Sequence, residues 1–313
     1  HKVDAPVKLM WNRESDMAHD FYRVGGFHNL KGTLNSKGKL TGLQDRTIVF
    51  TNKADGKPVR GGNVRAANIQ CPEIPNVRLE THKIPLTVPC GWWRAPTSCS
   101  VAWVFQSFIH EMATAAGRDH LEFLLEQYGE PQWLGKKTAR DFNTERAINV
   151  TKAAAKKGNW GKKMKKGQGR GLSFYFSHLG YFAEVAEVTV DSSNNVKVDR
   201  VVVACDVGIL LNKSGGENQV QGSVVDAIST LANQEITFEE GAVKEQNFDD
   251  YPLLRMPSHP KIEIEWLTTD HSPTGLGEPA FPPAVAAVTN AIFAATGKRI
   301  RTMPISKEGF RIV

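Results

Sequence analysis

The sequence predicts an α+β fold, with mixed and antiparallel sheets and packed helices arranged in two lobes. Three patterns support this prediction. Apolar residues recur with period 2 between 172 and 204, and they recur at spacings of 3 and 4 over 98–116 and again over 282–296. We expect a first lobe over 1–155, a Lys-rich connector over 156–171 and a second lobe over 172–313, for which 313 residues are ample.

The first lobe is expected to begin with β structure. An apolar run from Val7 to Trp11 predicts a strand, and the turn residues Asn35 to Gly38 predict a hairpin over 28–51. Frequent prolines and a Gly-Gly pair predict irregular structure over 52–98. Ser98 can then cap a helix that ends near Gly117, and shorter helices are expected over 119–128 and 144–156.

The second lobe is expected to alternate between sheet and helix. Strands are predicted over 172–177, 182–191 and 196–204, with a hairpin turn at 192–195. A helix is predicted over 216–233, a strand over 262–267 and a last helix over 282–296. This last helix has proline in its first turn and Gly297 at its C-terminal end, as helices prefer.

Composition excludes several classes of protein. Hydrophobic residues make up 41% and charged residues 23%, which excludes disordered and collagen-like chains. The longest apolar stretch, 201–211, is interrupted by Asp206 and is too short to span a membrane. The net charge of +6 is a local feature, because eight of the 39 Lys and Arg residues lie in 152–170, where there is no acid. That segment lacks interleaved aromatic residues apart from Trp160, so we do not expect nucleic-acid binding.

The four cysteines and the first residues complete this general description. Cys71, Cys90, Cys99 and Cys205 form no CxxC pair and have no His at ligand spacing, so we expect structural thiols and no metal ligands from this chain. The chain begins at His1 and enters an apolar run almost at once. We therefore expect it to be a piece of something longer.

The segment from Gly275 to Pro283 is the first candidate for chemistry. Glycines at 275 and 277 permit positive φ and close approach of a bulky partner, while the prolines restrict the turn and start a helix. Glu278 thus stands before a helix N-terminus and is a candidate general base. The alternative interpretation is that Glu278 only places a charge in the first helical turn.

Two further segments carry candidate site residues. Trp92, Trp93 and Arg94 can wall a flat pocket and supply one cation, or they can be core tryptophans beside a surface ion pair. Gln219 and Gly222, near the start of a helix, can hold a polar cofactor, although glutamines on helices are most often only solvated.

Seven stretches of the chain match one family in the order in which that family has them. They are residues 6–17 with 19–23, 74–78, 93–96, 184–188, 247–256 and 277–299. The chain resembles the C-terminal half of the molybdopterin-binding large subunit of the xanthine dehydrogenase and aldehyde oxidase family, and is most similar to the isoquinoline 1-oxidoreductase beta subunit. The resemblance implies the two-lobed fold of the family's molybdopterin-binding domains.

The resemblance also implies roles for single residues. Glu278 matches the family's active-site glutamate, the base of the hydroxylation, and Gln219 matches a glutamine that contacts the pterin. The stretch 93–96 matches a loop close to the metal, so Arg94 is a candidate for orienting the substrate and Trp92 and Trp93 for lining its pocket. Further contacts to the cofactor are expected from Ala95, Gly222 and Gly277.

Departures from the family pattern bear on these roles. An acidic residue usually stands at Gln221, a second glycine at Ser223, and Cys90 and Cys99 are unexpected beside the metal loop. The family's N-terminal half has two glycine-rich cofactor motifs, one ending in GQG and one of GGGFG type. Neither is recognised here, because GGGFG does not occur and the GQG at 167–169 lies in the Lys-rich connector. The cofactor is therefore expected to be shared with that half, present as a separate subunit or as the rest of a longer chain.

The implied function is part of a molybdenum hydroxylase that oxidises an N-heterocycle or an aldehyde with water as the oxygen source. The implied cofactor is molybdenum-molybdopterin in its cytosine dinucleotide form, with 2Fe-2S clusters on an iron-sulfur partner subunit. The alternative is a catalytically inactive assembly or binding subunit that keeps the fold. Related large subunits are often exported when folded, which slightly favours the periplasm over the cytoplasm.

Overall fold

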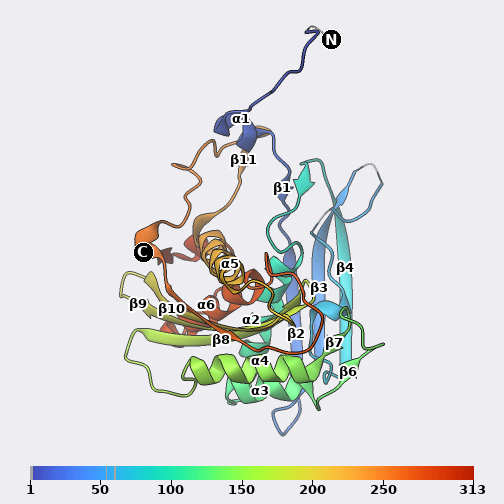
Figure 1. Ribbon diagram of the computed structural model, residues 1–313, viewed down its shortest axis with the longest axis vertical. Coiled ribbons are helices and arrows are strands. Elements are labelled where there is room, and N and C mark those ends of the chain that lie inside the picture. Colours follow the sequence, from blue (N-terminus) through green and yellow to red (C-terminus); the bar gives the residue numbers. More distant parts are fainter. Residues whose placement is uncertain (1–2, 54, 60) are drawn as a thin grey trace.

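The centre of the molecule is a five-stranded mixed sheet (Figure 1). The computed structural model describes residues 3–53, 55–59 and 61–313. The sheet has the order β13-β10-β9-β8, and a short fifth strand, β14, pairs with β10. The strands are β8 (Gln168–Ser177), β9 (Gly180–Val190), β10 (Asn195–Asp206), β13 (Lys261–Trp266) and β14 (Arg311–Ile312). The predicted strands of the second half are confirmed, and the structure is the mixed α+β fold that the sequence predicts.

Helices cover both faces of this sheet. On one face α6 (Phe281–Thr296) packs against β8 and β9, and on the other lies α4 (Thr144–Lys157). The approach of α6 requires glycine in β8, because a Cβ at Gly171 would lie 2.2 Å from the carbonyl oxygen of Ala287. Close contact between helix backbone and sheet thus fixes the position of the N-terminus of α6.

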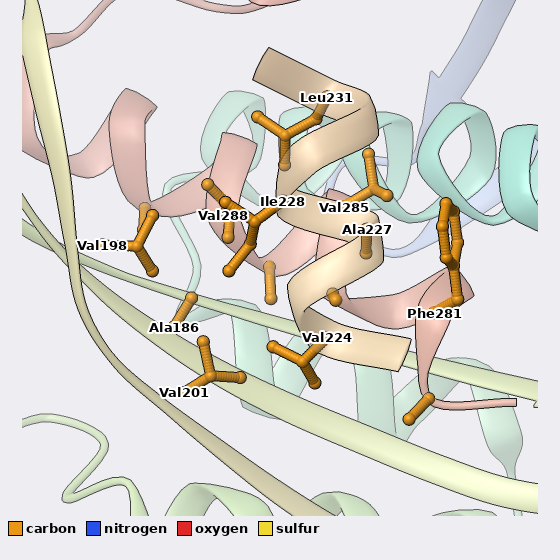
Figure 2. Packing of buried hydrophobic residues seen from close by; sticks show 14 of the residues in the cluster. Ala186, Val198, Val201, Val224, Ala227, Ile228, Leu231, Phe281, Val285 and Val288 are labelled. Atoms are coloured by element: carbon orange, nitrogen blue, oxygen red, sulfur yellow. The ribbon is translucent and has the colours of Figure 1, made fainter. Parts of the chain in front are cut away.

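Helix α5 (Lys213–Asn233) forms a further layer on α6. Figure 2 shows Val224, Ile228 and Leu231 of α5 packed among Val285 and Val288 of α6 and side chains of the sheet. Burial of such side chains contributes about 1.5–3 kcal/mol each. The starts of α5 and α6 therefore lie on one hydrophobic core.

A second core joins the first half of the chain to the same sheet. Helices α2 (Ser98–Ala115) and α3 (His120–Tyr128) contribute to it, together with the strands β2 (Phe27–Leu34), β3 (Leu40–Asn52) and β4 (Asn76–Leu86). β2 and β3 form the predicted hairpin. Since α2 also packs on α6, and α4 on β9, elements from 1–155 lie directly against elements from 172–313. The division into two lobes stays a prediction.

Two expectations for the first half are wrong. Residues 76–86, expected to be irregular, form β4, which pairs in parallel with β3. This strand lies at a sheet edge, where Pro85 near its end removes no essential hydrogen bond. The run from Val7 to Trp11 is not a strand, because none of the described residues forms a neighbouring strand that satisfies its backbone, and its side chains are largely exposed.

The connector is shorter than expected. It runs from the end of α4 at Lys157 to the start of β8 at Gln168, and its four lysines are exposed. Arg170 fastens it, because its Nη1 donates to the carbonyl oxygens of Asn159 (2.7 Å) and Lys162 (2.9 Å).

The remaining elements are short. They are α1 (Arg13–Ala18), β1 (Tyr22–Arg23), η1 (Ala66–Asn68), β5 (Cys90–Gly91), β6 (Trp133–Leu134), β7 (Phe142–Asn143), β11 (Phe238–Glu239), β12 (Ala242–Val243), η2 (Met256–Ser258) and η3 (Ile305–Glu308). None of the helices in the described part of the chain is both long enough and apolar enough to cross a membrane.

Candidate active site

Glu278 stands in a loop that leads directly into α6. The backbone N–H of Phe281, the first residue of the helix, donates to the carbonyl oxygen of Glu278 at 3.0 Å. Pro282 and Pro283 occupy the first turn, where their missing N–H groups cost nothing. The carboxylate is 39% exposed, so it is held by the loop but is open to a reactant.

The loop before α2 holds one oxygen of this carboxylate. The backbone N–H of Ala95 donates to Oε2 of Glu278 at 2.6 Å. Ala95 and Thr97 both have positive φ, 56° and 63°, a conformation that is costly for a residue with a Cβ. The loop thus stores strain in the conformation that directs this N–H at Glu278.

Arg94 fastens the Glu278 loop to α5. Its Nε and Nη2 donate to the carbonyl oxygen of Gly277 at 2.9 and 2.5 Å, and Nη2 lies 3.3 Å from Oε1 of Gln219. Nη1 is 3.6 Å from Oδ2 of Asp226. Burial raises the pKa of Asp226, and nearby Arg94 opposes that rise. With its donors used in this way, Arg94 acts first as a bridge between loop and helix.

Helix α5 presents a single face to this loop. Gln219, Gly222 and Asp226 follow one another at spacings of 3 and 4, which places them on one side of a helix. Ser223 lies beside them, and its hydroxyl donates to the carbonyl oxygen of Gly277 at 3.4 Å. The unexpected serine therefore adds a third donor group to the oxygen that Arg94 already binds.

The glycines of the site leave its surface open. A Cβ added at Gly222 would lie 3.7 Å from Arg94, and one at Gly277 would lie 3.7 Å from Gln219. Neither glycine has positive φ, and neither does Gly275, so they serve close approach rather than turn geometry. Gln219 is exposed, and no described residue bonds its amide nitrogen. An open backbone beside a free amide donor fits one wall of a large polar cofactor.

The side chains of Trp92 and Trp93 lie in different environments. Nε1 of Trp93 donates to Oγ1 of Thr230 at 3.2 Å, and the ring packs on the core around α5 and α6. Trp92 is 56% exposed. The structure places both in the loop next to Arg94, and their role in lining a substrate pocket stays a prediction.

His178 is a neighbour of Glu278 that the sequence analysis missed. It lies at the tip of the hairpin between β8 and β9, with its Nε2 3.5 Å from Oε2 of Glu278. Its Nδ1 is 3.3 Å from Oγ of Ser177. The only local signal is a two-residue turn, which in this sequence lacks the usual Asn-Gly.

The described residues form no cluster of metal ligands, and their large cavity lies away from Glu278. Within 3–53, 55–59 and 61–313, no three His, Cys, Asp or Glu side chains come together as a possible metal site. A cavity of about 440 Å³ is lined by residues such as Ile69, Phe142 and Phe176, and by none of the residues around Glu278. The Glu278 carboxylate itself is partly exposed at the surface of this chain.

Comparison with known proteins defines the class to which this surface belongs. The profile of the molybdopterin cofactor-binding domain matches residues 109–260. The chain is 27% identical to a nicotinate dehydrogenase subunit of Pseudomonas putida (99% of this chain, 27% of that protein) and 24% identical to the isoquinoline 1-oxidoreductase beta subunit of Brevundimonas diminuta (97% and 39%). It is also 26% identical to a membrane-bound aldehyde dehydrogenase (pyrroloquinoline-quinone) of Gluconacetobacter polyoxogenes, over 96% of this chain and 41% of that protein.

A solved structure shows the same fold. Quinoline 2-oxidoreductase from Pseudomonas putida 86 superimposes with a TM-score of 0.76 at 14% identity, over 95% of this chain and 63% of that chain. Residues 109–260 are thus similar to the molybdopterin cofactor-binding domain. These similarities agree with the resemblance of the sequence to molybdenum-binding subunits of the xanthine dehydrogenase and aldehyde oxidase family. The chain spans about a quarter to two fifths of the length of the three curated relatives.

Proposed function

We propose that this chain supplies the catalytic base and one wall of the cofactor site of a molybdenum hydroxylase. The enzyme would oxidise an N-heterocycle or an aldehyde, with water as the oxygen source. One observation carries the proposal: Oε2 of Glu278 is anchored by the N–H of Ala95, while Oε1 accepts no hydrogen bond from any described residue. A carboxylate with one oxygen held and the other free is suited to remove a proton.

The residues around Glu278 would hold the cofactor in complementary ways. The free amide nitrogen of Gln219 can donate a hydrogen bond to a pterin, while Gly222 and Gly277 permit close approach of a large group. Arg94 keeps these two surfaces together through Gly277. When bound, the molybdenum centre would supply the two-electron redox chemistry.

The other parts of the enzyme are proposals that rest on the resemblance to this family. We propose the cytosine dinucleotide form of the cofactor, a second half or separate subunit that completes the cofactor site, and an iron-sulfur subunit with 2Fe-2S clusters as electron acceptor. The 39% exposure of the Glu278 side chain supports a second wall from outside this chain. A periplasmic location remains part of the proposal.

Substitution of Glu278 by glutamine tests the function in the native complex. Glu278→Gln keeps the shape of the side chain but removes the base, so turnover should fall by about 10²- to 10⁴-fold. The molybdenum content should stay at the wild-type value, because Glu278 is not proposed to hold the metal. Glu130→Gln, at an exposed position outside the site, is the control.

Two results would contradict the proposal. One is full turnover in the Glu278→Gln variant. The other is a native complex that contains no molybdenum even with all of its subunits present, which would favour the alternative of an inactive assembly subunit.

A further inference from the structure

The hairpin between β8 and β9 places His178 at a fixed position. Ser177 pairs with Gly180, which leaves His178 and Leu179 as the two residues of the turn. Both have positive φ, 51° and 68°, as in a type I′ turn. Neither is Gly, Asn or Asp, so the turn carries a backbone cost of about 1–2 kcal/mol per residue. Such strain persists where the surrounding structure fixes the turn, and it often marks a functional position.

This turn directs the imidazole at the carboxylate of Glu278. The distance from Nε2 to Oε2 is 3.5 Å, which is long for a hydrogen bond. Hydrogen bonds in active sites are often long without a reactant and shorten when the reactant binds. The side chains of His178 and Glu278 are 33% and 39% exposed. Among the described residues, His178 is the only titratable side chain within ion-pair distance of Glu278. Arg94, which binds the Glu278 loop from the loop before α2, is engaged with Gly277, Gln219 and Asp226.

The hydrogen bond of the second ring nitrogen, Nδ1, determines whether Nε2 carries the proton that faces Glu278. Nδ1 lies 3.3 Å from Oγ of Ser177, a side chain that is buried. When the hydroxyl of Ser177 donates to Nδ1, the neutral imidazole carries its proton on Nε2 and can donate it to Oε2. Oε2 then has two donors, the imidazole and the N–H of Ala95, and the lone pairs of Oε1 remain free.

We propose that His178 is a positioning residue for Glu278: its Nε2–H, together with the N–H of Ala95, holds Oε2 and thereby presents Oε1 as the base. This inference rests on the proposed role of Glu278. Both donors favour the ionised carboxylate, because hydrogen bonds to a charged form stabilise that form. No proton leaves His178 in this role.

The first test compares two replacements of His178 in the native complex. His178→Phe keeps a ring but removes the donor, so kcat should fall about tenfold with little change in KM, as expected for the loss of one hydrogen bond. The acidic limb of the kcat/KM pH profile should move as well, because the variant lacks one of the two donors that hold Oε2. His178→Gln restores a donor and should recover most of kcat and the wild-type limb. An unchanged pH profile in His178→Phe overturns the proposal.

A second test needs no turnover. The rate at which diethyl pyrocarbonate modifies His178, followed by peptide mass spectrometry against pH, gives the titration midpoint of the imidazole. In Glu278→Gln this midpoint should differ from that of the wild type, because the variant lacks the carboxylate that His178 contacts. Exposed His82 serves as an internal reference with the same midpoint in both proteins.

The two measurements separate this inference from the proposed function. An unchanged His178 midpoint in Glu278→Gln shows that the two side chains do not interact, and overturns the positioning role whatever the activity. Full turnover in Glu278→Gln together with a shifted midpoint overturns the proposed function, while the measured contact stands.

Discussion

The backbone N–H of Ala95 donates a 2.6 Å hydrogen bond to Oε2 of Glu278, across 183 positions of sequence. The bond joins the loop that precedes α2 to the loop that precedes α6. Because α2 packs on α6, and α6 packs closely on the sheet, both loops start from rigid elements. The position of the proposed base is thus set by the packing of two helices.

The backbone of Ala95 offers a first prediction. Ala95 is fully buried and has positive φ, which glycine adopts without cost and β-branched residues resist. Ala95→Gly should change the free energy of unfolding by less than about 1 kcal/mol, since relief of strain offsets the lost methyl contacts. Ala95→Val should destabilise by about 2 kcal/mol or more. Urea unfolding measures both, and equal stability of the two variants would show that the loop relaxes.

The bridge formed by Arg94 offers a second prediction. Lysine cannot reproduce two donors on the carbonyl oxygen of Gly277, so Arg94→Lys should lose about 1.5–3 kcal/mol of unfolding free energy and part of the bound molybdenum. Asp226→Asn should have a smaller effect, because it leaves those two bonds in place. Arg78→Lys is the control: that side chain is 73% exposed, and exposed ion pairs contribute about 0–1 kcal/mol.

Measurement of metal content and urea unfolding on the same preparations decides the role of Arg94. If Arg94→Lys keeps both its stability and its molybdenum but raises KM, the residue orients substrate, as the resemblance implies, and does not bridge.

The sequence predicted the helices and most strands because their signals are local. Periodic apolar residues located α2 and α6, and turn residues located both long hairpins. β4 was missed because prolines at its ends are typical of loops, and they are compatible with a strand only at a sheet edge. Val7 to Trp11 has the composition of a strand but no partner in the described structure, and composition alone does not show whether a partner exists.

The residues of the candidate site could also be predicted only in part. Glu278, Gln219 and Arg94 were found from local motifs and from the family resemblance. The contact between His178 and Glu278 depends on how the β8–β9 hairpin meets the start of α6, so no local pattern reveals it. The bridge of Arg94 to Asp226 likewise requires α5 to lie beside the loop.

Buried Glu184 offers a third prediction. The side chain is fully buried in β9, and neither carboxylate oxygen has a hydrogen-bond partner among the described residues. Burial raises its pKa well above the usual value. A carboxyl group with a raised pKa stabilises the fold below its unfolded pKa, and this contribution is lost as pH rises. Glu184→Gln should therefore become progressively more stable than the wild type between pH 5 and 9.

The neighbouring glutamate on the same strand is the matched control. Oε1 of Glu187 accepts from Arg170 at 2.7 Å and lies 3.6 Å from Arg200. Glu187→Gln weakens these pairs and should destabilise at neutral pH. Urea unfolding across the pH range measures both variants, and a stability difference between Glu184→Gln and wild type that does not vary with pH would mean that Glu184 does not titrate.

The histidine pair between α2, α3 and the C-terminal segment offers the last prediction. Nη1 of Arg299 donates to Nδ1 of His110 at 2.9 Å, and the ring centroids of His110 and His120 lie 4.6 Å apart. Burial and the nearby Arg299 lower the pKa of His110 to about 4, with Glu111 and Asp119 opposing the shift. Burial likewise lowers the pKa of His120 well below its usual value. Both imidazoles are therefore neutral in the folded protein at pH 7.

The lowered pKa of His110 makes the folded protein less stable at acidic pH. A histidine with a lowered pKa stabilises the fold above its unfolded pKa, near 6.5, and this contribution is lost as pH falls through the folded value. For His110 the loss should amount to about 3 kcal/mol by pH 4. His110→Gln keeps an acceptor for Arg299 but does not titrate, so its stability should fall less between pH 6.5 and 4. His82→Gln, at an exposed position, should follow the wild type. Urea unfolding at half-unit pH steps distinguishes them, and parallel curves for His110→Gln and wild type would show that folding does not lower the pKa of His110.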